Sequence, residues 1–175
     1  MPDINTERLI IQKFTEEYLT NNYVDWLNDN DIVRYSDQRF KKHSIDTCRQ
    51  YWQSFKGSPN EFWAILEKCS HKMHHIGNLT TYVDENHGLV DISIMIGDKS
   101  LWGQGYGLEA WSGMCKYLLG IDSTRKITAG TLAVNTPMLK IFKKSGMVKD
   151  GIRKNNCLYN GKPVDMIYYT IFNKD

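Results

Sequence analysis

Leu101-Trp-Gly-Gln-Gly-Tyr-Gly-Leu-Glu-Ala110 is a glycine-rich loop that runs directly into an amphipathic helix. Its glycines, Gly103, Gly105 and Gly107, leave room for a ligand and can take the positive φ values that turn successive N–H groups toward one point. The helix that follows carries apolar residues at spacings of three and four, and its free N–H groups and positive dipole end face the loop. The stretch therefore predicts a binding site for an anion such as a phosphate.

Length and composition describe one ordinary globular domain. The chain has 175 residues, of which 41% are hydrophobic and 24% charged, and its formal net charge is +2. These values fit a single domain with a sizeable core and do not indicate a nucleic-acid-binding platform. The first residues lack a cationic and then apolar signal segment, and no apolar run approaches the roughly 18 residues of a membrane helix. We therefore expect a cytoplasmic protein without nucleic-acid or membrane partners.

The four cysteines have no short paired spacing, which favours reduced, structural thiols.

The hydrophobic pattern alternates strands and helices without a linker or repeat, which predicts a mixed α/β domain. Turn-forming residues at 84–88 and at Asn160-Gly161 predict that the strands on either side of them pair antiparallel. Helices are expected over residues 16–28, 31–35, 44–55, from the glycine-rich loop to 120, and 136–145. Strands are expected over residues 9–13, 62–66, 75–82, 89–96, 126–134, 149–159 and 165–172.

Part of the glycine-rich stretch also fits a dinucleotide-binding fingerprint. Residues 105–110 match G-x-G-x-x-G/A, which binds a pyrophosphate at the start of a βαβ unit. That unit needs its first glycine directly after a strand, whereas residues 97–102 separate Gly103 from the preceding strand. The next strand also ends in Val134-Asn135 and not in an acidic residue that could hold a ribose. The dinucleotide-binding interpretation is therefore disfavoured.

Four other segments stand in a characteristic order around the loop: Thr6-Glu-Arg-Leu9, Trp26-Leu-Asn-Asp29, Asp91-Ile-Ser-Ile-Met-Ile96 and Asn135-Thr-Pro-Met-Leu-Lys-Ile-Phe-Lys-Lys-Ser-Gly-Met147. Together with the glycine-rich loop they span nearly the whole chain. They resemble the GCN5-related N-acetyltransferases, in particular the branch of ribosomal-protein alanine and serine acetyltransferases. Trp102 replaces the family's usual Gln or Arg at the start of the glycine motif, a mild departure because the implied phosphate contacts are mainly to the backbone.

The resemblance implies an α/β (α+β) fold with a single acetyltransferase domain over residues 1–175. Its acceptor-side part would cover about 1–60 and its coenzyme-binding core about 61–175. It implies a mixed, mostly antiparallel sheet of six to seven strands with a splayed central pair and helices on both faces. It also implies acetyl-CoA as cosubstrate and no metal. The residues it places at the coenzyme are Met95 and Ile96 for the pantetheine, Gly103, Gln104, Gly105, Tyr106, Gly107 and Leu108 for the pyrophosphate, Asn135 for the pantetheine or acetyl region, and Lys144 for the outer part.

The expected reaction is direct attack of a neutral amine on the thioester carbonyl in a ternary complex, which needs a base, a donor to the carbonyl oxygen and positioning. Asp91 lies sixteen residues before Gly107, where several family members carry a general-base glutamate, and is the candidate base. Ser93 shares its strand face and could relay a proton or orient the acceptor. An exposed aspartate at the start of a strand is also common without a catalytic role, and Ser93 could simply fill space. The carbonyl oxygen is expected to meet backbone N–H groups near Ile96.

No general acid is assigned. The family's frequent tyrosine corresponds to Phe142, which has no proton to give. Strand tyrosines more often pack than catalyse. The tyrosines that could substitute in space are Tyr106, Tyr159, Tyr168 and Tyr169.

The acceptor is expected to bind the early helices and the polar loop Arg34-Tyr-Ser-Asp-Gln-Arg39. This region looks like family members that acetylate amino sugars carried on nucleotides, including the pseudaminic-acid pathway enzyme, and Arg34 and Arg39 would bind the diphosphate. The candidate acceptor-binding residues are Arg34, Tyr35, Arg39 and His87. Alternatively, the arginines form surface ion pairs with Asp29, Asp31 and Asp37.

Two other functions stay open. The acceptor could be the N-terminus of a protein. A different class is a catalytically silent domain that binds CoA as a sensor or assembly part. The family includes monomers and dimers, so a homodimer is left open as well.

A cysteine- and histidine-rich segment, Cys69-Ser-His-Lys-Met-His-His75, has the residue types of a zinc site. Its spacing matches no standard metal-binding pattern. We expect a solvated loop there and no metal site.

Overall fold

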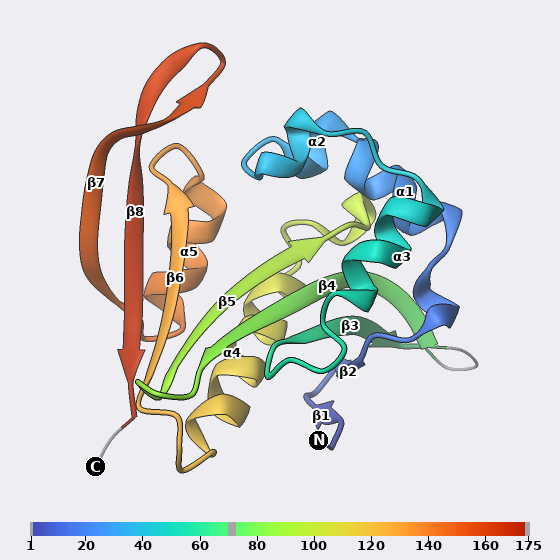
Figure 1. Cartoon of the computed structure of the whole chain (residues 1–175), viewed down its shortest axis with the longest axis horizontal. Coiled ribbons are helices and arrows are strands. Elements are labelled where there is room, and N and C mark those ends of the chain that lie inside the picture. The colour runs from blue at the N-terminus through green and yellow to red at the C-terminus, as the bar shows by residue number, and fades with distance from the viewer. Residues whose placement is uncertain (1, 70–72, 174–175) are drawn as a thin grey trace.

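The computed structural model describes residues 2–69 and 73–173, which form one eight-stranded sheet with helices on both faces (Figure 1). The strand order is β1-β2-β3-β4-β5-β6-β8-β7. The strands are β1 (Ile4–Asn5), β2 (Leu9–Lys13), β3 (Glu61–Lys68), β4 (Met73–Asp84), β5 (Leu89–Ile96), β6 (Lys126–Leu132), β7 (Val148–Tyr159) and β8 (Lys162–Phe172). The α-helices are α1 (Asn21–Asn28), α2 (Asn30–Val33), α3 (Ile45–Gln53), α4 (Tyr106–Leu119) and α5 (Thr136–Lys144). The short 3₁₀ helices are η1 (Glu16–Tyr18), η2 (Asp37–Phe40) and η3 (Lys99–Leu101).

The predicted α/β fold class is confirmed, and the predicted sheet of six to seven strands gains one more. The additional strand is β1, whose two residues pair antiparallel with Ile10 and Ile11 of β2. So short a strand leaves no alternation in the sequence to detect. No helix in the described ranges is long and apolar enough to span a membrane.

The helix predicted over residues 16–28 is divided in the structure. Thr20 adopts an extended conformation, with φ −105° and ψ 161°, and its side chain accepts a hydrogen bond from the Tyr23 N–H. An N-cap residue starts a helix and does not continue one. The chain therefore forms η1, breaks at Thr20 and starts again as α1.

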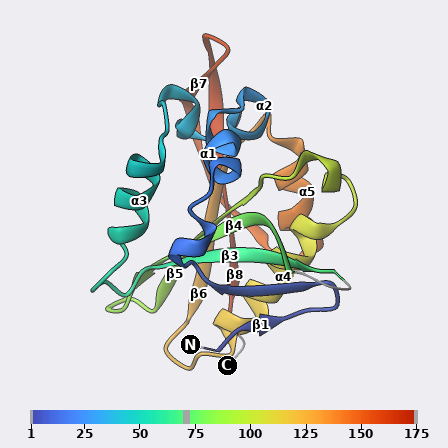
Figure 2. The same ribbon diagram turned by 90° about the vertical axis from the view of Figure 1, so that its right-hand side faces the viewer.

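Helices lie on both faces of the sheet, as Figure 2 shows from the side, and each face carries an apolar core. One core packs α4 and α5 against the central strands and contains Trp111, Met114 and Phe142. The other packs α1, α2 and α3 against the opposite face and contains Trp26 and Phe62. Helix α4, which follows the glycine-rich loop, and the N-terminal helices therefore pack on opposite faces of the sheet.

The centre of the sheet is split. β5 and β6 pair in parallel only between residues 89–91 and 126–128, and beyond that point the two strands diverge (Figure 1). All other neighbouring strands pair antiparallel along most of their lengths. The β6-facing backbone groups of β5 after Asp91 thus have no strand partner. The splayed central pair that the resemblance implied is present.

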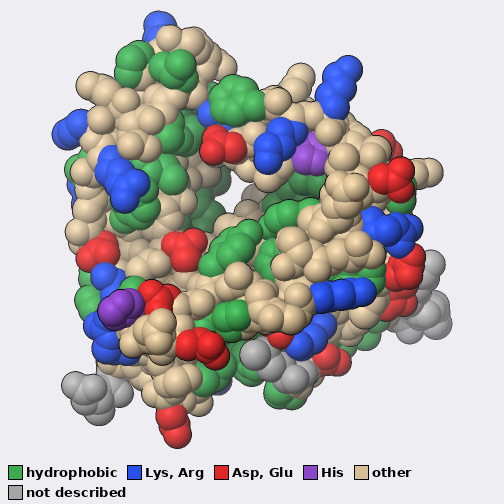
Figure 3. All heavy atoms as spheres, in the orientation of Figure 1, with side chains coloured by type: hydrophobic (Ala, Val, Ile, Leu, Met, Phe, Trp, Pro, Cys, Tyr) green, Lys and Arg blue, Asp and Glu red, His purple; other side chains and the backbone are tan. Residues whose placement is uncertain are grey.

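The two halves of the molecule meet again beyond the split. The ring of Tyr35, after α2, stacks on that of Tyr159, at the tip of the β7–β8 hairpin, with centroids 5.6 Å apart and planes at 26°. Arg39 Nη2 donates to the carbonyl oxygen of Leu158 at 2.9 Å. We call these two contacts the bridge. An opening remains between the paired ends of β5 and β6 and the bridge, and it is visible in the space-filling view (Figure 3).

Candidate functional site

The glycine-rich loop has the geometry of an anion site. Gly103 and Gly105 have φ values of 77° and 88°, in the left-handed region that favours glycine. A Cβ on Gly103 would meet no atom within 4 Å, so this part of the loop is open to a ligand. The backbone N–H groups donate to no protein acceptor in the described chain at Gly103, Gly105, Tyr106, Gly107 and Leu108. A row of unpartnered N–H groups at the positive end of a 14-residue helix fits a pyrophosphate.

Close packing explains the third glycine. A Cβ on Gly107 would lie 3.3 Å from Ile141 Cδ1 and 3.6 Å from Ile96 Cγ1. The start of α4 is thus pressed against both α5 and the end of β5.

Trp102, at the position where the family carries Gln or Arg, donates from Nε1 to the Ile96 carbonyl at 2.9 Å. That indole occupies one of the backbone groups expected to meet pantetheine, which leaves the other edge groups of β5.

Side chains of β5 alternate between the two faces of the sheet. Val90 and Ile92 are buried in the core against α4. Asp91 and Ser93 point to the opposite face, where Ser93 Oγ lies 2.5 Å from Thr80 Oγ1 of β4. Both residues are exposed. The predicted catalytic pair therefore lies on the α3 side of the sheet, at the point where β5 leaves β6.

The environment of Asp91 shifts the pKa of its carboxyl group. Although Asp91 is accessible to solvent, the protein atoms packed around its carboxyl group displace part of its hydration and raise this pKa above its ordinary value, while a hydrogen bond from the Thr128 hydroxyl to Oδ2, 2.9 Å long, acts in the opposite direction. A raised carboxyl pKa makes the group a stronger base, as proton abstraction from an ammonium requires. Thr128, which holds the carboxylate in place, was missed in the sequence because 37 residues separate the two.

The tyrosines named as possible general acids have other partners. Tyr106 donates its hydroxyl proton to Glu67. Tyr169 is buried with its ring 5.0 Å from that of Phe142, which is itself 1% exposed. Tyr159 belongs to the bridge, and the Arg153 guanidinium lies over the Tyr168 ring.

Two tyrosines that the sequence did not single out do face the catalytic side. Tyr51 of α3 and Tyr82 of β4 have their hydroxyl oxygens 3.0 Å apart, and Tyr82 is paired in register with Asp91. Burial raises the pKa of Tyr51 well above its usual range, so this hydroxyl keeps its proton. The alternation of β4, which places Thr80 and Tyr82 on one face, is the signal that could have identified Tyr82.

The two remaining coenzyme candidates lie on α5. Asn135 is the N-cap of this helix: its Oδ1 accepts from the Met138 N–H at 3.3 Å and its Nδ2 donates to Thr131 Oγ1 at 2.9 Å. The structure thus gives Asn135 a capping role within the helix. Lys144 is exposed in the last turn.

The acceptor candidates do not form one cluster. Arg34 is half-buried, with its guanidinium over the rings of Tyr35 and Trp102 at 4.9 and 5.7 Å. Arg39 donates to the Ser36 and Leu158 carbonyl oxygens and its side chain is only 14% exposed, so the bridge engages it. His87 lies in the β4–β5 turn, at the end of β5 remote from the bridge, and its N–H donates to Asp84. The structure therefore separates His87 from the other three.

The alternative, in which Arg34 and Arg39 form surface ion pairs with nearby aspartates, is only partly confirmed. Asp29 and Asp31 pair with Lys99 at 2.7 and 3.0 Å, and not with the arginines. Arg39 lies 3.5 Å from Asp37, whose side chain is 86% exposed. Such a contact with a solvated carboxylate contributes little to stability.

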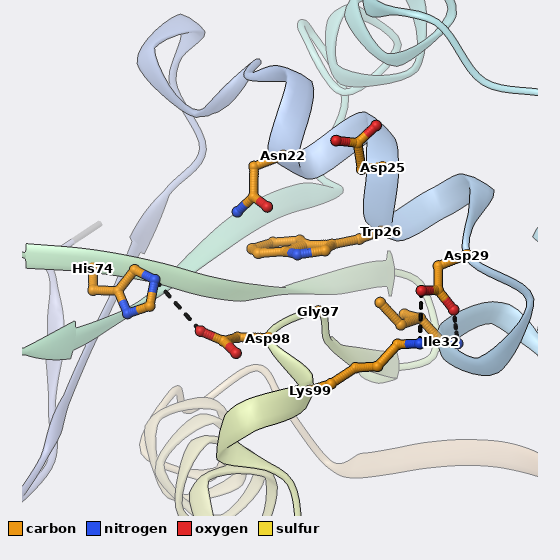
Figure 4. Close-up of a pocket in the computed structure, with 9 residues that line it drawn as sticks. All are labelled: Asn22, Asp25, Trp26, Asp29, Ile32, His74, Gly97, Asp98 and Lys99. Atoms are coloured by element: carbon orange, nitrogen blue, oxygen red, sulfur yellow. Dashed lines mark hydrogen bonds and ion pairs between the residues drawn. The ribbon is translucent and has the colours of Figure 1, made fainter.

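A polar pocket of about 340 Å³ lies beside this site, between α1 and the turn after β5 (Figure 4). The Trp26 ring lies over Gly97, where a Cβ would come within 1.9 Å of the indole. His74 Nε2 and Asp98 Oδ2, 3.5 Å apart, form part of its wall. The contact between Trp26 and Gly97 shows that α1 packs closely on the segment that leads into the glycine-rich loop.

The cysteine- and histidine-rich segment falls partly outside the described residues, which exclude 70–72. Cys69 is exposed, and His75 is held by Asn78 Oδ1 and the Gly77 carbonyl, each 3.0 Å from Nε2. Burial lowers the pKa of His75 to about 4. No group of three or more metal-ligating side chains occurs within ranges 2–69 and 73–173.

The comparisons with known proteins agree with this architecture. Residues 8–148 match the family model of the acetyltransferase (GNAT) domain. No curated protein matches the chain. Among solved structures, a GNAT-family acetyltransferase from Bacillus anthracis has a TM-score of 0.83 at 20% identity, covering 99% of this chain and 100% of its own.

Two further solved structures have stated substrates. Spermidine N-acetyltransferase from Vibrio cholerae, in complex with CoA and spermine, has a TM-score of 0.82 at 16% identity, with 95% of this chain and 96% of that chain covered. An acetyltransferase from Salmonella typhimurium that modifies the N-terminal serine of a 50S ribosomal subunit protein has a TM-score of 0.80 at 15% identity, with 99% and 100% covered. At these identities the likeness shows the fold alone.

Proposed function

The chain belongs to the GNAT acetyltransferase family and is an N-acetyltransferase that uses acetyl-CoA, and we propose that it acetylates the primary amine of a small molecule entering from the α3 side of the sheet. One observation carries this proposal. The anion site of the glycine-rich loop and the polar row of Asp91, Ser93 and Thr80 lie on opposite faces of the sheet and meet at the split between β5 and β6. Two substrates can therefore approach each other from opposite sides.

The residues suit the coenzyme's parts. The N–H groups from Gly103 to Leu108 would hold the pyrophosphate, and the unpaired edge of β5 near Met95 and Ile96 would align the pantetheine. Acetyl-CoA supplies a thioester carbonyl activated for attack. The N–H groups of the same unpaired edge are available to the carbonyl oxygen as charge develops on it.

Asp91 would act as the base in this proposal. Its carboxylate faces the acceptor side and would take the proton of the incoming ammonium, directly or through one water molecule. Ser93, hydrogen-bonded to Thr80, would orient the amine. No general acid is assigned, because Phe142 is buried and Tyr106 already donates to Glu67.

Among small amines we propose a nucleotide-linked amino sugar first. Arg34 supports this acceptor, because its guanidinium makes no ion pair with a carboxylate in the described chain and lies near Trp102, beside the glycine-rich loop. Arg39 no longer supports it, since its guanidinium is used in the bridge. An elongated acceptor could place its diphosphate near Arg34 while its amino group reaches Asp91.

The test is release of the CoA thiol from acetyl-CoA with a panel of amino-sugar nucleotides, polyamines and N-terminal peptides. We expect turnover with a small-molecule amine. In the Asp91→Asn variant kcat should fall by about 10²- to 10⁴-fold with an unchanged KM for acetyl-CoA. Asp122→Asn, which changes an exposed aspartate between α4 and β6, is the matched control and should behave as wild type. Turnover with peptides alone would overturn the small-molecule acceptor, and full activity of Asp91→Asn would overturn the role of this residue.

A further inference from the structure

A side chain near one edge of the sheet is bonded to the glycine-rich loop. Arg8, directly before β2, donates from Nη1 to the Gln104 carbonyl oxygen at 3.1 Å and from Nε to Glu109 Oε2 at 2.7 Å. Its guanidinium also lies over the Tyr106 ring, 4.1 Å from the centroid. One arginine therefore contacts the loop, the first residue of α4 and the first turn of that helix.

Glu109 is in turn held on three sides. Its Oε1 accepts from the Thr6 hydroxyl at 2.6 Å and from the Arg8 backbone N–H at 2.7 Å, and its side chain is 16% exposed. Burial alone would raise the pKa of Glu109, but these hydrogen bonds and the Arg8 charge outweigh burial and lower it. The carboxylate thus stays ionised and fixes the guanidinium in one orientation.

The contact with Gln104 has a consequence for the anion site. The Gln104 carbonyl and the Gly105 N–H belong to the same trans peptide unit, so they point in opposite directions. Holding the carbonyl on the Arg8 side therefore turns the Gly105 N–H toward the opposite side. That N–H donates to no protein acceptor in the described chain. Without such an anchor a loop containing two left-handed glycines has many accessible conformations.

We propose that Arg8, fixed by Glu109, is a positioning residue that aims the Gly105 N–H at the coenzyme pyrophosphate. This inference rests on the proposed coenzyme site. Arg8 acts through the Gln104–Gly105 peptide and not by direct attraction of the anion, because its charge is already paired with Glu109.

The test is calorimetric titration of CoA into the wild type and three variants. Arg8→Gln and Glu109→Gln should each raise the Kd for CoA roughly tenfold, equivalent to about 1.4 kcal/mol. Lys13→Gln, which removes another ion pair of β2, should leave the Kd unchanged. The Glu109→Gln variant is decisive: an arginine that attracted the anion directly would bind CoA more tightly once its carboxylate partner was removed.

A second probe separates positioning from general damage to the fold. S-acetylpantetheine lacks the pyrophosphate, so its kcat/KM should be the same in the wild type, Arg8→Gln and Glu109→Gln. In both variants the KM for acetyl-CoA should rise at unchanged kcat. Tighter CoA binding by Glu109→Gln, or an equal loss with S-acetylpantetheine, would overturn the inference. A wild type that fails to bind CoA would instead refute the proposed coenzyme site.

Discussion

The bridge should set how readily the β7–β8 hairpin tip moves away from the N-terminal helices. In the variant Arg39→Met with Tyr159→Leu, both contacts across the opening are lost. The aromatic pair is worth about 0.5–1.5 kcal/mol. The hydrogen bond from the guanidinium to the Leu158 carbonyl is worth about 0.5–1.5 kcal/mol, the range for an ordinary hydrogen bond, since Leu158 is 58% exposed and water can replace the donor.

The two contributions together are about 1–3 kcal/mol, which corresponds to an increase of about 5- to 150-fold in the opening equilibrium. The assay is hydrogen exchange at the backbone amides of residues 154–162, which should speed up by that factor. Lys42→Met, a change of an exposed cation in the loop after η2, is the control and should leave exchange as in the wild type. Unchanged exchange in the double variant would refute the reasoning. If the bridge also limits acceptor size, the double variant should gain kcat/KM for bulky amines relative to slender ones, with the KM for acetyl-CoA unaltered.

Three other predictions concern single positions. Thr128→Val removes the hydrogen bond that lowers the pKa of Asp91, so this pKa should rise further and the acid limb of the pH profile of kcat/KM should move to higher pH; a shift to lower pH would contradict the assigned contact. The pKa of Asp91 is higher in the folded protein than in the unfolded chain, so protonation of Asp91 stabilises the folded state. This stabilisation is lost as pH rises through the folded-state pKa, and at neutral pH the ionised carboxylate lowers the free energy of unfolding. Asp91→Asn should therefore raise the urea midpoint at neutral pH and lose this advantage in acid, and a lowered midpoint at neutral pH would count against burial as the cause of the shift. Gly77→Ala would place a Cβ 2.2 Å from the Met95 carbonyl oxygen and should cost about 3 kcal/mol or more in urea unfolding, whereas Gly151→Ala, with no atom within 4 Å, should cost far less; equal losses would show that the approach of β4 to β5 is not the cause.

Local patterns in the sequence predicted the elements on which the site is built. The glycine spacing and the apolar face of α4 are both read within twenty residues, and the structure has the loop and helix there. The alternation of β5 likewise placed Asp91 and Ser93 on one face, since the side-chain period of a strand does not depend on the partner strand. Fold class followed from the order of these elements together with the family resemblance.

Contacts between distant segments were beyond sequence reasoning. Arg39 looked like a free cation because its partner, the Leu158 carbonyl, is 119 residues away and is a backbone atom with no signature in the sequence. The pairing of Arg8 with Glu109 could not be predicted for a similar reason, because 101 residues separate the two side chains. Composition and periodicity report which face a residue occupies, but they do not report which charge it meets on that face.

The split sheet has a kinetic consequence if acetyl-CoA and the acceptor bind on the two faces proposed above. Neither substrate would then cover the entrance of the other, and we predict that they add in random order. Initial-rate plots should then intersect for both substrates, and each product should act as a competitive inhibitor only of the substrate that shares its side of the sheet.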